Sequence, residues 1–128
     1  AHKGEGLGTQ FLKHIERTEV IVHVLEVQPE AEGVPSDRDP IEDFEIIHRE
    51  LESYDPELVE RPQLVALNKI DLPFVRDEAD RLRTYFEQER EIPFVTISAA
   101  TGENLDEFKD LVGKIVYEGA EEKEFWEE

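Results

Sequence analysis

The stretch QLVALNKIDLP, residues 63–73, decides the fold class of this 128-residue chain. Its first five residues, 63–67, form an apolar run with the length and composition of a buried parallel strand. The motif Asn-Lys-x-Asp follows directly, as Asn68, Lys69, Ile70 and Asp71. Open parallel sheets bind ligands at the carboxyl ends of their strands. The stretch therefore predicts an α/β fold with a ligand site at this strand end.

The side chain of Asp71 suits a guanine base. An ionised carboxylate accepts two parallel hydrogen bonds from guanine N1–H and its 2-amino group, whereas adenine offers an acceptor at N1 and has no 2-amino group. Charge-assisted bonds contribute about 1.5–3 kcal/mol each, and sites of this kind reject analogues by about four orders of magnitude. We expect Asn68 to face O6 and N7 and the stem of Lys69 to lie along the ring. The alternative is a solvated turn, where Asn and Asp are common.

A second segment strengthens the prediction of a base pocket. The apolar run 93–97 ends in Ser98, Ala99 and Ala100, small residues that let the backbone approach a ligand closely. We expect the Ala99 N–H to donate to guanine O6 and the Ser98 hydroxyl to orient the Asp71 carboxylate. Ser98 lies 27 residues after Asp71, which leaves room for one strand-helix-strand crossover. The two strand ends are therefore predicted to form one pocket.

These paired motifs resemble the base-recognition elements of translation-factor-type GTPases, and the flanking residues narrow the resemblance to the Obg (CgtA) family. AHKGEGLGTQFLKHIERT, residues 1–18, is similar to the end of switch II and the following helix. The segment 39–73, from DPIEDFEIIHREL to RPQLVALNKIDLP, is also closely similar. The resemblance covers nearly the whole chain except residues 28–38 and the acidic tail. Glu26 is a small departure, because family members more often carry Asp there.

The resemblance implies a three-layer parallel sheet with flanking helices, which is part of a P-loop NTPase G domain. It also implies that the intact protein binds GTP or GDP and hydrolyses GTP with Mg²⁺. The expected location is the cytoplasm, and the expected role is assembly of the large ribosomal subunit, with the ribosome as partner. We expect no membrane association.

The phosphate-binding loop of such proteins, Gly-x-x-x-x-Gly-Lys-Ser/Thr, has no counterpart in this chain. Gly113 and Lys114 do not fit it, since Phe108 takes the place of the first glycine and Ile115 that of the hydroxyl residue. The Asp-x-Pro-Gly element that approaches Mg²⁺ in the family is also missing. We therefore expect residues 1–117 to be the C-terminal half of an Obg-type G domain and 118–128 an acidic tail. The N-terminal half would supply the phosphate and metal contacts, so the chain alone is expected to be inactive, with no catalytic residue and no metal ligand.

Composition limits the remaining possibilities. The chain has 33 acidic and 14 basic residues, a formal charge of −19, which disfavours broad contact with nucleic acid phosphates. It has no cysteine, which excludes a disulfide framework and thiol catalysis. No segment is long and apolar enough to be a signal peptide or a membrane span. Two other functions stay open: a circularly permuted GTPase and a non-catalytic acidic interaction module.

Hydrophobic periodicity predicts alternating helices and strands, as a doubly wound α/β fold requires. We expect a strand at 20–27, a polar loop at 28–37, and a helix capped by Asp39 with Pro40 at its first position. Asn104 is expected to cap the last helix. The inward-facing residues of the first, third and fourth helices are expected to be Leu7, Phe11, Leu12 and Ile15; Ala79, Leu82, Tyr85 and Phe86; and Leu105, Phe108, Leu111, Val112 and Ile115.

Overall fold

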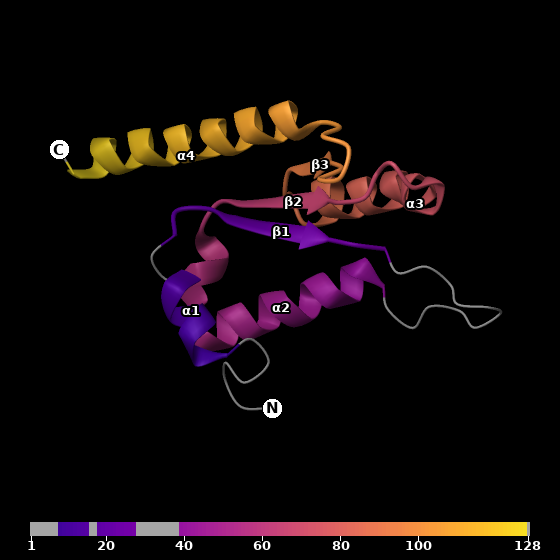
Figure 1. Ribbon diagram of the computed structural model, residues 1–128. Coiled ribbons are helices and arrows are strands. Elements are labelled where there is room, and N and C mark those ends of the chain that lie inside the picture. The colour runs from indigo at the N-terminus through magenta and orange to yellow at the C-terminus, as the bar shows by residue number, and fades with distance from the viewer. Residues whose placement is uncertain (1–7, 16–17, 28–38, 128) are drawn as a thin grey trace.

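The computed structural model describes residues 8–15, 18–27 and 39–127. In chain order the elements are α1 (Thr9–Ile15), β1 (Ile21–Leu25), α2 (Pro40–Tyr54), the 3-10 helix η1 (Pro56–Glu60), β2 (Gln63–Leu67), α3 (Pro73–Thr84), the π-helix η2 (Tyr85–Glu89), β3 (Phe94–Thr96) and α4 (Leu105–Glu127) (Figure 1). The predictions for Leu7 and for the loop at 28–37 lie outside the described residues.

The three strands form one parallel sheet in the order β1-β2-β3. Ile21 pairs with Gln63 across β1 and β2, and Val65 pairs with Phe94 across β2 and β3. Each step between neighbouring strands passes through a helix, as parallel pairing requires. The predicted α/β class, with a parallel sheet and flanking helices, is confirmed.

The helices cover the sheet from both sides. On one face, Phe44 of α2 and Val75 and Leu82 of α3 join Val65 and Leu67 of β2 in a buried cluster. On the other face, α4 packs the apolar side of its first three turns on β2 and β3, and Figure 1 shows it across the sheet from α1 and α2. None of the helices among the described residues is both long and apolar enough to cross a membrane.

Asp39 begins α2 as predicted. Its Oδ1 accepts from the Ile41 N–H at 3.0 Å, and Pro40 occupies the first turn, where its missing N–H costs no hydrogen bond. The carbonyl of Asn104 accepts from the Phe108 N–H, as expected at a helix start. The Asn104 side chain does not cap α4, however. It donates to the Thr96 carbonyl at 3.0 Å, so it ties α4 to the end of β3.

Two further predictions were wrong in detail. Phe11 is 50% exposed whereas Leu12 is fully buried, because successive residues of a helix point in directions about 100° apart and both cannot face the core. The predicted strand 20–27 is shorter, at Ile21–Leu25, and it is not buried on both faces. Val24 is 57% exposed, because it lies on the same face as Val22, beyond the part of the sheet that α4 covers.

Candidate functional site

The loop after β2 is held between the two neighbouring strands. The Asn68 N–H donates to the Leu25 carbonyl of β1 at 2.9 Å, and the Ile70 N–H donates to the Ile97 carbonyl at 3.0 Å. Between these anchors, Lys69 has a φ of 66°, in the left-handed region that residues with side chains seldom adopt. Such strain persists where the surrounding structure enforces it, and it is concentrated at functional sites.

Direct hydrogen bonds join this loop to the loop after β3. The Ser98 hydroxyl donates to Asp71 Oδ1 at 2.7 Å, as the sequence predicts. The Ala99 N–H, expected to face guanine O6, donates to Asn68 Oδ1 at 3.1 Å. Ser98 is fully buried, so its hydroxyl is shielded from competition with water. The carboxylate of Asp71 is thus held in one orientation at the carboxyl edge of the sheet.

The loop after β3 closes on itself around Ser98. The Ser98 hydroxyl accepts from the Thr101 N–H at 3.1 Å, and the Ser98 carbonyl accepts from the Gly102 N–H at 2.8 Å. Gly102 has a φ of 87°, a conformation that favours glycine. Ala99 and Ala100 lie exposed on the outside of this turn. The turn therefore presents small side chains and backbone next to Asp71.

Ile70 and Lys69, the other two residues of the Asn-Lys-x-Asp motif, have different surroundings. The Ile70 side chain is buried in the core among α3 and β2 residues, so it anchors the loop and is not available to contact a ligand. Lys69 lies on the surface, with its Nζ 3.4 Å from Glu26 Oε2 at the end of β1. The structure thus brings Asn68, Asp71, Ser98 and Ala99 together, with Lys69 at the rim.

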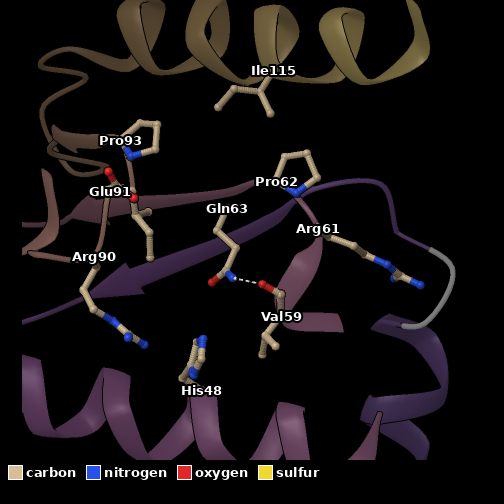
Figure 2. Close-up of a pocket in the computed structure, with 10 residues that line it drawn as sticks. His48, Val59, Arg61, Pro62, Gln63, Arg90, Glu91, Pro93 and Ile115 are labelled. Carbon is tan, nitrogen blue, oxygen red and sulfur yellow. Dashed lines mark hydrogen bonds between the residues drawn. The ribbon is translucent and has the colours of Figure 1, made fainter. Parts of the chain in front are cut away.

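A cavity of about 460 Å³ lies at the opposite, amino edge of the sheet, between α2 and α4 (Figure 2). Both arginines that line it, Arg61 and Arg90, already lie against other groups of the protein. Arg61 donates to the Ile15 and Thr18 carbonyls at 2.8 and 2.9 Å. Arg90 lies over the Phe44 ring, and its Nε is 3.3 Å from Glu45 Oε1, although the pair does not have hydrogen-bond geometry. We therefore place the candidate site at the carboxyl edge, not in this cavity.

The contacts at the carboxyl edge that sequence reasoning missed include the ion pair of Arg76 with Glu103. The two residues are 27 positions apart, the same separation as Asp71 and Ser98. Opposite charges at a given separation are common in a chain with 33 acidic and 14 basic residues, so no signal in the sequence singles out this pair.

The parallel sheet, its flanking helices and the paired strand-end motifs define a partial G domain of the α/β class. No family model matches the chain. The chain is 47% identical over 124 residues to GTPase Obg of Persephonella marina. The matched segment covers 97% of this chain and 34% of that protein. It is 54% identical to GTPase Obg of Desulforudis audaxviator, and this match covers 83% of the chain and 23% of that protein. It is 44% identical to GTPase Obg of Aquifex aeolicus, and this match covers 97% of the chain and 34% of that protein.

The chain therefore belongs to the Obg family over the segment that it shares with these proteins. It spans about a third or less of the length of the curated relatives that it matches.

Proposed function

We propose that this chain is the base-binding part of a GTPase and that its carboxyl edge holds guanine. The proposed site consists of Asn68, Lys69, Ile70, Asp71, Ser98, Ala99 and Ala100, with Ile70 acting through the backbone and the core. The observation that carries the proposal is the Ser98–Asp71 hydrogen bond, since it orients the carboxylate that we propose reads the base. The relatives' names, GTPase Obg, agree with it.

The geometry supports a preference for guanine over adenine. Asp71 Oδ1 is bound by Ser98, but a carboxylate has about four lone-pair sites, so the group keeps enough to accept from guanine N1–H and the 2-amino group. The Asn68 oxygen faces the Ala99 N–H, which leaves the Asn68 amide hydrogens as donors toward N7. Ala99 and Ala100 lie exposed next to Asp71. The Ala99 N–H already donates to Asn68 Oδ1, so the bond to O6 that the sequence predicts would have to share this donor. Adenine would leave the Asp71 carboxylate without hydrogen-bond donors, at a cost of about 1.5–3 kcal/mol for each bond that is lost.

The test is Asp71→Asn in the intact protein. The substitution replaces one carboxylate oxygen with an amide donor that faces a guanine donor, so affinity for GDP should fall by about 2–4 kcal/mol. Xanthine carries a carbonyl in place of the 2-amino group, so preference should turn toward xanthosine diphosphate. Asp71→Ala should weaken both nucleotides without this inversion. Asp77→Asn, an exposed carboxylate of α3, is the matched control and should leave the preference unchanged. Guanine selectivity retained by Asp71→Asn in competition titrations would refute the proposal.

We further propose that the intact protein hydrolyses GTP with Mg²⁺, in the cytoplasm, and acts in large ribosomal subunit assembly. These proposals rest on the family resemblance. In the part of the chain that the structure describes, no three His, Asp or Glu side chains converge to hold a metal ion. Because Mg²⁺ is commonly held by one or two carboxylates together with nucleotide phosphates, and the phosphate loop has no counterpart in this chain, we derive no catalytic step from the described residues.

We retain the division into residues 1–117 and an acidic tail at 118–128 as a proposal based on composition; α4 itself runs through residue 117 to Glu127. The chain alone should show no GTP turnover, because phosphate binding and catalysis would depend on other residues. A single-turnover assay of the purified 128-residue chain tests this, and turnover that persists after repurification would contradict it. The similarity to Obg over 97% of the chain favours this function over a permuted GTPase or an acidic interaction module.

A further inference from the structure

Arg76 and Glu103 form an ion pair on the outside of the candidate site. Arg76 Nη2 donates to both Glu103 Oε1 and Glu103 Oε2, each at 2.9 Å. Arg76 lies in the first turn of α3, five residues after Asp71. Glu103 closes the turn that begins at Ser98. The ion pair therefore connects the helix that follows the Asp71 loop to the loop that carries Ser98.

Backbone hydrogen bonds link each partner of this ion pair to the site. The Glu103 carbonyl accepts from the Ser98 N–H at 3.0 Å, and the Glu103 N–H donates to Thr101 Oγ1 at 3.2 Å. The Arg76 N–H donates at 3.2 Å to the carbonyl of Leu72, the residue directly after Asp71. Short, hydrogen-bonded segments therefore link Arg76 to the residue after Asp71, and Glu103 to Ser98.

Stability does not account for this pair. The two side chains are 53% and 37% exposed, and ion pairs at such sites contribute about 0–1 kcal/mol to folding. The ion pair of Arg81 with Glu78 joins residues of α3 itself, and Arg81 also pairs with Asp39 at the start of α2, so neither contact involves the loop that carries Ser98. The Arg76–Glu103 pair instead joins α3, the helix that follows the Asp71 loop, to the loop that carries Ser98.

We propose that Arg76 and Glu103 are positioning residues that hold the two loops at the spacing needed to read the guanine 2-amino group. This inference rests on the proposed function. A carboxylate accepts two parallel bonds only when both of its oxygens are aligned with the base edge. Loss of the ion pair should therefore weaken the bond to the 2-amino group more than it weakens nucleotide binding as a whole.

The test compares GDP with inosine diphosphate, which lacks the 2-amino group, in titrations of the intact protein. Arg76→Met and Glu103→Gln should each reduce affinity for GDP about 3- to 10-fold, the equivalent of about one kcal/mol. Affinity for inosine diphosphate should fall less than affinity for GDP, because inosine makes only the N1–H bond to Asp71, so the ratio of the two affinities falls. The charge-exchanged double variant, Arg76→Glu with Glu103→Arg, should restore the ratio. Glu78→Gln, which breaks an ion pair within α3, is the matched control and should leave the ratio unchanged.

The inference would be overturned if both single variants kept the ratio of GDP affinity to inosine diphosphate affinity. It would also be overturned if Glu78→Gln lowered this ratio equally, or if the double variant failed to restore it. Thermal unfolding of each variant checks that the exposed substitutions leave the protein folded. The Asp71→Asn experiment distinguishes a failure of the positioning role from a failure of the proposed function. If Asp71→Asn inverts base preference while the Arg76 and Glu103 variants keep the ratio, only the positioning role fails. If Asp71→Asn keeps guanine selectivity, the proposed function itself fails.

Discussion

Replacing Ser98 with alanine should weaken guanine nucleotide binding by a measurable amount and with little other damage. The side chain is fully buried, and its hydroxyl donates to Asp71 Oδ1 at 2.7 Å while accepting from the Thr101 N–H at 3.1 Å. Alanine removes one oxygen atom and leaves only a small void. A hydrogen bond to a charged group contributes about 1.5–3 kcal/mol. Because Asp71 is only partly buried and Thr101 is exposed, water can replace part of both bonds. We therefore expect a loss of about 1–2 kcal/mol, or roughly 5- to 30-fold in affinity for GDP.

A double-mutant cycle tests the physical reason for this loss. Ser98→Ala, Asp71→Ala and the double variant are titrated with GDP in the intact protein, and the coupling free energy should be about 1–2 kcal/mol because the two side chains are in direct contact. Asp77→Asn is the control, since this exposed carboxylate of α3 is not part of the proposed site. Its coupling to Asp71→Ala should stay below about 0.5 kcal/mol. Additive effects of Ser98→Ala and Asp71→Ala would show that Ser98 does not orient the carboxylate.

Two further predictions concern stability and association. Burial lowers the pKa of His23, and the nearby His48 adds to this effect while the hydrogen bond to Gln63 Oε1 at 2.7 Å opposes it. The unfolded chain therefore binds more protons below pH 6.5, so the free energy of unfolding should fall as pH drops from 7.5 to 5.5. Urea unfolding should show a shallower pH dependence in His23→Leu, and an unchanged dependence would contradict this account. Among the described residues the outer edge of β1 is unpaired and Val24 is 57% exposed, so the purified 128-residue chain should self-associate, and Val24→Lys should reduce the association. A monomer at every concentration in analytical ultracentrifugation would count against this role of the edge.

The fold class and the place of the candidate site could be predicted because both are carried by consecutive residues. An apolar run of five residues, 63–67, indicates a buried strand, and the chemistry of Asn68 and Asp71 indicates a base-binding edge. The Ser98–Asp71 hydrogen bond also followed from the sequence, since the carboxyl ends of neighbouring parallel strands lie at the same edge.

Only the tertiary structure decided which side chains of the loops after β2 and β3 lie at the candidate site and which are buried. The left-handed conformation of Lys69 depends on anchors from two other strands, at Leu25 and Ile97. The exposure of Val24 depends on how far α4 extends over the sheet, and the Asn104 side chain bonds β3 because that strand ends beside it. The pairing of Arg76 with Glu103 likewise requires the start of α3 to lie against the turn after β3. Sequence determines local patterns, whereas these contacts depend on the distance between elements that are brought together only when the core packs.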